Sequence, residues 1–251
     1  MKALISVSDK TGIVELGKQF QELGIEIIST GGTSAALNQA EIPTTEVSTF
    51  TGSGEILGGR VKTLHPKIFG GILALRKDAE HQLQIKKHSL ELIDWVVVNL
   101  YPFEKIVSEN KIPKSEMIEF IDIGGVSLLR AAGKNFQDVV VLCDPSDYAP
   151  VLEEFKNNKT VSAHTRKKLT AKVFAHSAHC DSMIANFFTR TESIISNAEK
   201  PIKETESEIF PMELTLISLI KIKPWILSKI NPMLSVLLNL IYKTLKWLNL
   251  E

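Results

Sequence analysis

The stretch that sets the fold class is 3–33, ALISVSDKTGIVELGKQFQELGIEIISTGGT. An apolar run over 3–7 predicts a strand, and apolar residues at helical spacing then predict a helix that ends at Gly24. The same order of strand, polar turn and helix starts again at Ile25. Repeated units of this kind indicate parallel strands joined by crossover helices, so we expect an α/β fold with helices on both faces of a mostly parallel sheet.

Later apolar runs extend this pattern. Short strands are predicted near 44–47, over 95–100 and over 139–143, and helices over 34–40, 78–92, 115–120, 126–132 and 162–188. The run WVVVNL at 95–100 is apolar at nearly every position, as expected of a strand buried on both faces. We therefore expect a layered domain that ends in one long helix.

Two polar turns follow the first two predicted strands, SVSDKTG at 6–12 and STGGT at 29–33. In a parallel sheet both lie at the carboxyl edge, where hydroxyls and the N–H groups of helix starts can surround a phosphate. Lys10 would add a full positive charge. Each turn alone is also compatible with a helix cap, and neither matches a Walker loop or a dinucleotide fingerprint, so a mononucleotide is the better fit.

A third glycine-rich stretch, LGGRVKTLHPKIFGGIL, occupies 57–73. Arg60, Lys62, Thr63 and His65 lie between its two Gly-Gly pairs, a composition that lets the backbone and basic side chains approach an anion closely. Glycine pairs by themselves indicate only a turn. The cations between them favour a binding site.

Composition restricts the class of protein. The 251 residues carry a net charge near zero and include only two cysteines, Cys143 and Cys180, which is typical of one fair-sized or two small domains in a reducing compartment. The neutral balance argues against a protein that binds nucleic acid, but it allows a local pocket for one phosphate. The first residues lack the apolar stretch of a signal peptide, so we expect a cytoplasmic protein.

Tyr101 and Asp122 are candidates for chemistry. Tyr101 follows a buried strand and precedes Pro102, which would hold the phenol in place; an amphipathic tyrosine at the edge of the core is the alternative. Asp122 lies between isoleucines and before two glycines, an unusual place for a surface charge, although a helix cap would also explain it.

The histidines outside the glycine-rich loop carry little functional signal. His176 and His179 lie three residues apart beside Cys180. Packing of a long helix explains them better than metal binding, because no second cysteine pair accompanies them.

Six motifs, taken together and in order, resemble those of the inosine monophosphate cyclohydrolase half of the bifunctional purine biosynthesis proteins. They are SVSDKTG at 6–12, STGGT at 29–33, GGRVKTLHP at 58–66, NLYPF at 99–103, IDIGG at 121–125 and AAGKN at 131–135. The resemblance covers about 1–216 without interruption. In that family this half is fused to a folate-dependent formyltransferase.

The resemblance implies a methylglyoxal-synthase-like domain over 1–195, a homodimer, and no cofactor or metal. The implied substrate is 5-formamidoimidazole-4-carboxamide ribonucleotide, which closes its second ring with loss of water to give inosine monophosphate. The family's catalytic residues correspond to Lys62, Tyr101, Asp122 and Lys134. Lys62 and Tyr101 would then act on the formyl group, Asp122 in proton transfer at the carboxamide, and Lys134 on the developing oxyanion charge.

A nucleotide-binding set follows from the same resemblance. The ribose phosphate would be held by Ser8, Lys10, Thr11, Ser29, Gly32 and Thr33. Arg60, Thr63 and His65 would line the pocket, and Ser6, Thr30, Gly31, Asn99, Gly124 and Gly125 complete the set.

The end of the chain departs from this family. Residues 196–216 resemble the linker that leads to the formyltransferase domain, whereas 217–251 do not match that domain, so we expect no formyl transfer from this chain. The tail is rich in Leu, Ile and Trp, and its uncharged run over 230–242 is shorter than the ~20 residues of a membrane helix. A frame slip or truncated gene would explain it, and an amphipathic membrane or partner helix is the alternative.

Two alternatives to the cyclohydrolase remain open. The chain could be a nucleotide-sensing regulatory domain of the same fold, which needs the phosphate-binding turns but no group for proton transfer. It could also be a folded but inactive fragment. Methylglyoxal synthase is a further enzymatic relative, disfavoured because the motif KTLHP at 62–66 belongs to the purine branch.

Overall fold

Five parallel strands form the centre of the fold in the computed structural model, which describes residues 1–101, 103, 113 and 116–191. The strands are β1 (Lys2–Val7), β2 (Glu26–Ser29), β3 (Thr44–Glu46), β4 (Trp95–Asn99) and β5 (Val140–Leu142). Their order across the sheet is β3-β2-β1-β4-β5, and each neighbouring pair is parallel. The prediction of a parallel α/β sheet is therefore confirmed.

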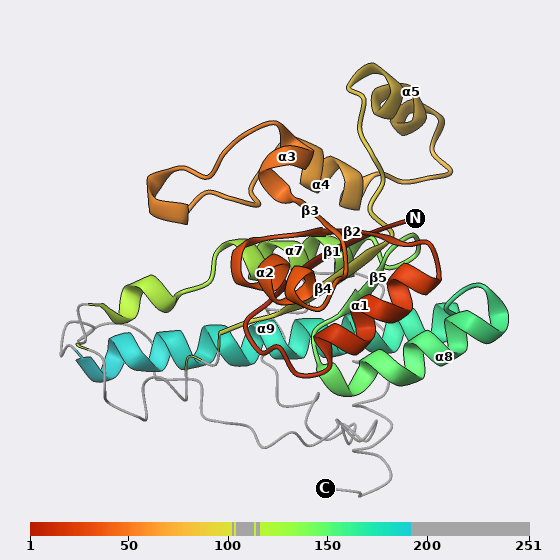
Figure 1. Cartoon of the computed structure of the whole chain (residues 1–251). Helices are drawn as coiled ribbons and strands as arrows, with labels where there is room; N and C mark the ends of the chain where they lie inside the picture. Colours follow the sequence, from red (N-terminus) through yellow and green to blue (C-terminus); the bar gives the residue numbers. More distant parts are fainter. Residues whose placement is uncertain (102, 104–112, 114–115, 192–251) are drawn as a thin grey trace, which may run out of the picture. The chain divides into compact units, whose positions relative to one another are not determined.

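Helices cover both faces of this sheet (Figure 1). They are α1 (Ile13–Glu22), α2 (Gly31–Gln39), α3 (Val47–Thr51), α4 (Pro66–Leu73), α5 (Ala79–Lys87), α7 (Gly124–Lys134), α8 (Tyr148–Asn158) and α9 (Ala163–Thr191), with short 3-10 turns η1 (Leu57–Gly59), η2 (Met117–Phe120) and η3 (Pro145–Asp147). Figure 1 shows α1 and α8 on one side of the sheet and α3 and α4 on the other. The long helix predicted over 162–188 is α9.

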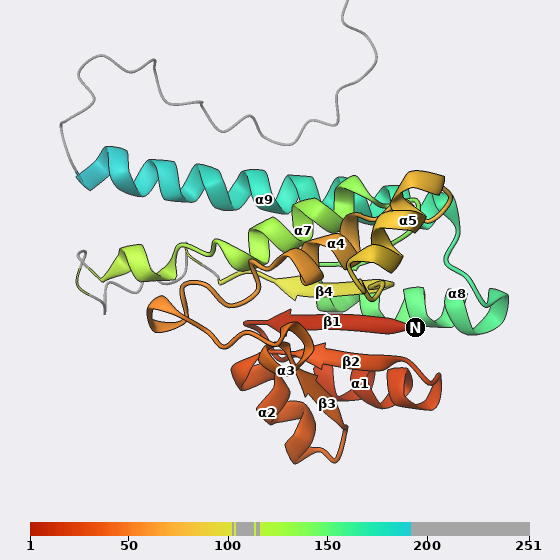
Figure 2. The same ribbon diagram turned by 90° about the horizontal axis from the view of Figure 1, so that it is seen from above.

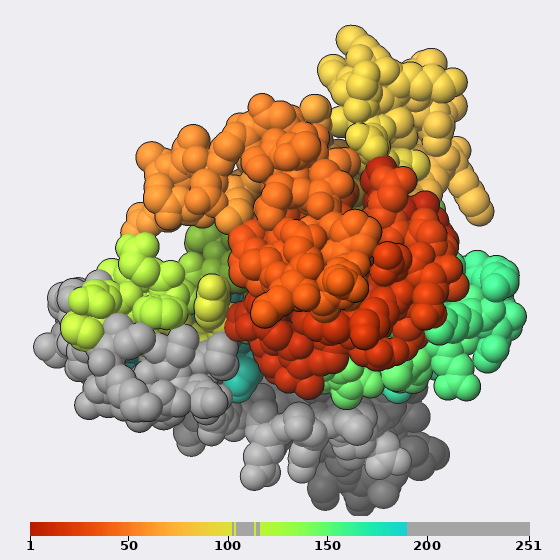
Figure 3. Space-filling model, viewed as in Figure 1, coloured from red at the N-terminus to blue at the C-terminus, as the bar shows by residue number. Residues whose placement is uncertain are grey.

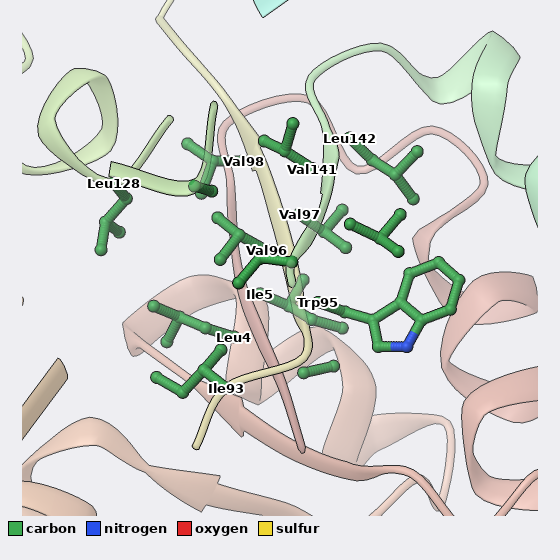
Figure 4. Packing of buried hydrophobic residues seen from close by; sticks show 14 of the residues in the cluster. Leu4, Ile5, Ile93, Trp95, Val96, Val97, Val98, Leu128, Val141 and Leu142 are labelled. Atoms are coloured by element: carbon green, nitrogen blue, oxygen red, sulfur yellow. The ribbon is translucent and has the colours of Figure 1, made fainter. Parts of the chain in front are cut away.

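The core is built on the two central strands, β1 and β4. All five residues of β4 are buried, which explains why this strand is apolar along its whole length. Trp95 contacts Phe20 of α1 and Phe155 of α8, with ring centroids 5.3 Å apart in each case. Figure 4 shows β4 side chains packed with Leu4 and Ile5 of β1. The sheet centre is thus a rigid base for the loops at its ends.

Two helices begin earlier than the sequence pattern predicted. α2 starts at Gly31 rather than at residue 34, and α7 starts at Gly124 rather than at residue 126. Both predictions placed the glycines in the preceding turn, because glycine is a poor helix former in isolation. In the structure the glycines form the first turn of each helix.

α5 is shorter than the predicted helix over 78–92. Asp78 caps its start by accepting a hydrogen bond from the His81 N–H at 2.8 Å. The helix ends at Lys87, because Ser89 takes a left-handed conformation with φ of 49°. The chain then turns toward β4.

The second Gly-Gly pair of 57–73 lies in α4 and not in a loop, which corrects the sequence interpretation. A Cβ atom added to Gly71 would lie 2.4 Å from the carbonyl oxygen of Glu91. The pair therefore lets α4 pack closely against the segment that leads into β4, and it has no place in anion binding.

A second, smaller apolar cluster supports the segment after β4. Phe103, Met117 and Phe187 pack together, with Phe120 and Met183 beside them, so η2 is held by the distal part of α9. No helix among the described residues combines the length and apolar composition of a membrane span. The predicted boundaries at 195 and 216 and the tail over 217–251 lie outside the described residues.

Candidate active site

The candidate site lies where the carboxyl ends of β1 and β4 meet. After β1 the chain builds the sheet outward through β2 and β3, and it then returns to add β4 and β5 on the other side. Such a reversal leaves a crevice at the carboxyl ends of the strands, the usual place for ligands in open α/β sheets. In Figure 2 the arrowheads of β1 and β4 point toward the segments that surround this crevice.

A cavity of about 760 Å³ occupies this position. Its walls come from five stretches of chain, 6–10, 30–33, 58–63, 99–101 and 118–125. Figure 3 shows the surface hollowed between the orange residues near 60 and the yellow-green residues near 120. Most of the residues predicted from the motifs are therefore brought to one place.

Asn99 at the end of β4 holds the first polar turn. Its Oδ1 accepts hydrogen bonds from the N–H groups of Ser8 at 2.6 Å and Asp9 at 2.9 Å, and its Nδ2 donates to the Asp9 carbonyl at 2.9 Å. The ammonium of Lys10 donates to the Val7 carbonyl at the cavity wall. Burial lowers the pKa of Lys10, and the neighbouring Asp9 charge opposes this shift. An anion at this wall would stabilise the charged form.

The first turn of α2 forms the adjacent wall. Among the described residues, no hydrogen-bond acceptor is found for the N–H groups of Gly31 and Gly32. Thr33 ties the helix start to β1, since its hydroxyl donates to the Val7 carbonyl at 3.1 Å and lies 3.2 Å from the Val7 nitrogen. The hydroxyls of Ser6 and Thr30 are 3.2 Å apart. Free N–H groups beside these hydroxyls suit a phosphate group.

The loop before α4 supplies two cations, and each is paired with a carboxylate. Lys62 Nζ lies 2.6 Å from Glu55 Oε2. Arg60 forms a two-pronged contact with Glu119 across the cavity, which includes Nε to Oε2 at 3.2 Å. Glu119 raises the pKa of Arg60, and Arg60 lowers the pKa of Glu119. A negatively charged ligand would meet both cations.

Asp122 and Tyr101 also line the cavity. Asp122 Oδ1 accepts a hydrogen bond from the Gly125 N–H at 2.7 Å, so the cap suggested as an alternative also exists. Burial raises the pKa of Asp122, and this hydrogen bond opposes the increase. Tyr101 is half exposed and meets the edge of the Phe120 ring at a centroid distance of 6.2 Å. A partly buried carboxyl with a raised pKa is suited to exchange a proton.

Glycine at 124 is required by the approach of Thr63. A Cβ atom at Gly124 would lie 2.7 Å from Thr63 Oγ1. Thr63 is itself buried, so it has little room to move away. This contact brings the cationic loop against the start of α7.

Three of the predicted binding residues support the local structure instead of lining the cavity. Ser29 Oγ donates to the Ile5 carbonyl at 2.8 Å inside the sheet. The Thr11 hydroxyl donates to Asp9 Oδ1 at 2.6 Å. His65 Nδ1 accepts from the Lys67 N–H at 3.1 Å and so caps α4. Thr11 and His65 each bond a residue two positions away, whereas Ser29 joins β2 to β1.

Lys134 does not join the other three catalytic candidates. It is the last residue of α7, whose first residues line the cavity, and it does not line the cavity itself. A helix of 11 residues is about 16 Å long, so Lys134 lies far from Asp122. The predicted action of Lys134 on the oxyanion has no geometric support in this chain.

Two carboxylates that pair with cations of the site, Glu55 and Glu119, were missed by sequence reasoning. Glu119 is 59 residues from its partner Arg60, and no local pattern indicates that pairing. Glu55 and Lys62 flank the paired residues Ile56 and Val61. Prediction of a hairpin over 55–62 would therefore have placed Glu55 opposite Lys62.

No group of three or more His, Cys, Asp or Glu side chains in the described part of the chain is placed to hold a metal. His176 lies on α9, where burial lowers its pKa. It lines a second cavity with Cys143, Asp144 and Lys172. Burial raises the pKa of the Cys143 thiol to about 11, so this thiol is a poor nucleophile at neutral pH.

Comparison with known families accounts for nearly all of the described chain. Residues 12–127 match the MGS-like domain, and residues 132–214 match the family described as AICARFT/IMPCHase bienzyme. A solved structure, the crystal structure of ForH, aligns with a TM-score of 0.68 and 32% identity, covering 75% of this chain and 97% of that one. Fold and cavity therefore define an MGS-like α/β domain.

Named relatives identify the family. The bifunctional purine biosynthesis protein PurH of Acetivibrio thermocellus is 54% identical over 186 residues, which is 74% of this chain and 36% of the relative. PurH of Bacillus subtilis is 50% identical over 188 residues, 75% of this chain and 37% of the relative. The chain belongs to the family of bifunctional purine biosynthesis proteins. It spans about a third of the length of these curated relatives.

Proposed function

We propose that this chain is an IMP cyclohydrolase that closes the ring of 5-formamidoimidazole-4-carboxamide ribonucleotide with loss of water. The observation that carries the proposal is a single cavity that is lined by Asp122, a carboxyl whose pKa is raised by burial, and also by Lys62 and Tyr101. The family of the chain supports the same reaction. A cytoplasmic homodimer is part of the proposal.

The chemistry requires three kinds of assistance. The carboxamide nitrogen attacks the formyl carbon, and the formyl oxygen gains negative charge. That oxygen finally leaves as water, with one proton from the carboxamide N–H and one from the formamide N–H. An amide nitrogen is a weak nucleophile, so removal of its proton and polarisation of the formyl oxygen must occur together. No metal or cofactor is part of this scheme.

Asp122 is the proposed proton acceptor for the carboxamide N–H. Its hydrogen bond from Gly125 fixes the carboxylate at the start of α7, and burial keeps its pKa above the ordinary value. A base whose pKa lies closer to neutrality accepts a proton and passes it to the departing oxygen more readily. Lys62 and Tyr101 are the proposed hydrogen-bond donors to the formyl oxygen.

The ribose phosphate is proposed to bind between the two polar turns. Lys10, the open N–H groups of Gly31 and Gly32, and the hydroxyls of Ser6 and Thr30 line the same wall. Full charge, helix-start N–H groups and hydroxyls together match a phosphate better than a neutral sugar. Arg60 and Thr63 are proposed to bind the remainder of the nucleotide.

The deciding experiment is a spectrophotometric assay of ring closure by the purified chain, combined with calorimetric titration of inosine monophosphate. We expect turnover of the formylated ribonucleotide and binding of the product nucleotide. Binding without turnover would instead identify a nucleotide-sensing domain of the same fold, and the absence of both would identify an inactive fragment.

A further inference from the structure

The ammonium group of Lys62 lies against the first turn of α2. A Cβ atom added to Gly31 would be 3.3 Å from Lys62 Nζ, so the close approach depends on the missing side chain of that glycine. The ammonium also lies 2.6 Å from Glu55 Oε2. Glu55 itself does not line the cavity, so it acts on Lys62 from outside it.

The electrostatic field of α2 alone would not keep a cation in this place. The N-terminus of a helix carries roughly half a positive charge, so it repels an ammonium group and attracts anions. The Lys62 side chain is also about one third exposed, and solvent offers it many alternative rotamers. A negative charge is needed to hold it near α2, and Glu55 supplies one.

A short hairpin brings Glu55 and Lys62 together. Ile56 and Val61 exchange backbone hydrogen bonds, from the Ile56 N–H to Val61 at 3.1 Å and from the Val61 N–H to Ile56 at 3.3 Å. Glu55 and Lys62 are the next residues outward, which places them opposite each other. The backbone thus sets the register of the two charges before any ligand binds.

We propose that Glu55 is a positioning residue for ring closure, which holds the ammonium of Lys62 against the start of α2. This inference rests on the proposed function, because it assumes that Lys62 donates a hydrogen bond to the formyl oxygen. Glu55 touches neither substrate nor reacting atoms. Its contribution is to reduce the freedom of Lys62 before substrate arrives, which lowers the barrier to reaction more than it changes binding.

The kinetic test uses the full chain with the substitution Glu55→Gln, which keeps the size of the side chain and removes its charge. We expect kcat to fall about two- to fivefold while KM stays within about twofold, the range for an exposed charge pair. In a Lys62→Met background the same substitution should change kcat by less than about twofold. Glu22→Gln, at an exposed position on α1, serves as the matched control and should behave as wild type.

A second measurement does not depend on turnover. The side-chain ammonium signal of Lys62 in heteronuclear NMR spectra, assigned by its loss in Lys62→Met, should be sharp in the wild type and broadened or shifted in Glu55→Gln. If the wild type lacks ring closure, the proposed function fails while this signal still tests the positioning. Unchanged kcat in Glu55→Gln, or an equal loss in the Lys62→Met background, would overturn the inference.

Discussion

Asn99 shows how much of this site depends on a single side chain. It joins the end of β4 to a turn about 90 residues earlier, through three hydrogen bonds to Ser8 and Asp9. The motif that contains Asn99 predicted a contact with substrate. In the structure the Asn99 side-chain amide is hydrogen-bonded to backbone groups of Ser8 and Asp9. Its main effect is therefore to keep the Ser8–Lys10 turn at the cavity wall.

Asp122→Asn tests the proposed base. The amide keeps the shape of the side chain but cannot accept the proton, so we expect turnover to fall about 100-fold or more while affinity for inosine monophosphate stays within about threefold. Steady-state kinetics and calorimetry measure the two effects. Asp78→Asn is the matched control, because asparagine caps α5 as well as aspartate does. Near-normal turnover in Asp122→Asn would remove this residue from the mechanism.

The pH dependence of the same reaction tests the environment of Asp122. Because burial raises the pKa of this carboxyl above 3.8, the active carboxylate form is lost at a higher pH than for an exposed aspartate. We therefore expect kcat/KM of the wild type to decline on the acid side while circular dichroism still reports a folded chain. A rate that stays constant down to pH 4 would argue against Asp122 as the base.

Lys10→Ala tests the phosphate wall. A charged hydrogen bond contributes about 1.5–3 kcal/mol, so the loss of one should weaken binding of inosine monophosphate about 10- to 100-fold. Inosine has no phosphate, and its affinity should hardly change. Calorimetric titration of both ligands decides the matter, with Lys18→Ala on α1 as the control. Equal weakening of nucleotide and nucleoside would mean that Lys10 supports the fold and not the phosphate.

At the scale of single elements, apolar periodicity predicted the five strands and the helices α1, α2, α7 and α9, but not α3 or α4, and several of its errors occurred at glycines. Gly31 and Gly124 begin helices, although the same residue type is common in turns. Gly71 lies inside α4, where contact with the Glu91 backbone excludes any side chain. Glycine occurs at these three positions for different structural reasons, and the sequence alone does not distinguish these reasons.

Gly71→Ala tests the packing of α4. The added Cβ would lie 2.4 Å from the Glu91 carbonyl oxygen, so either the helix or the segment before β4 must shift. We expect the free energy of unfolding to fall by about 1–3 kcal/mol in urea titrations. Gly54→Ala is the control, since a Cβ there meets nothing within 4 Å, and it should change stability by less than about 0.5 kcal/mol. Equal stability of the two variants would show that α4 tolerates the displacement.

At the scale of the whole described domain, α9 is tied to the sheet by charge as well as by packing. Lys172 on α9 contacts Asp144 and Asp147 at 2.7 Å each, directly after β5. The Lys172 side chain, as a hydrogen-bond donor, is the main reason that the pKa of Asp144 is lowered to about 2. The helix is thereby held beside the second cavity and, farther along, beside the Phe103 cluster that supports η2.

Asp144→Asn tests how much the Lys172–Asp144 ion pair stabilises the folded state. The lowered pKa means that the charged form of Asp144 stabilises the folded state above pH 3.8, and that this stabilisation is lost as the pH falls toward 2. Because the side chain is 40% exposed, screening limits the effect to about 1 kcal/mol or less. Urea titrations from pH 7 to pH 2 should show a smaller acid-induced loss in Asp144→Asn, whose amide oxygen still accepts from the Ser146 N–H. Identical pH dependence would exclude the ion pair as a source of stability.

The sequence by itself determined the features that depend on neighbours along the chain. The periodicity of apolar residues indicated alternating parallel strands and helices, and the turns after β1 and β2 carried the composition of a phosphate site. Local motifs were also sufficient to bring Lys62, Tyr101 and Asp122 forward as candidates. These features are local because strand and helix formation follow from side-chain spacing and backbone geometry.

Only the tertiary structure decided which of these groups meet. It paired Arg60 with Glu119 and Lys62 with Glu55, and it turned His65, Thr11 and Ser29 into supports for the backbone. It also separated Lys134 from Asp122, although both belong to motifs around the same helix. The physical reason is that a contact between distant residues depends on how whole elements pack, and a helix with one end at a cavity carries its other end about 1.5 Å farther away with each residue.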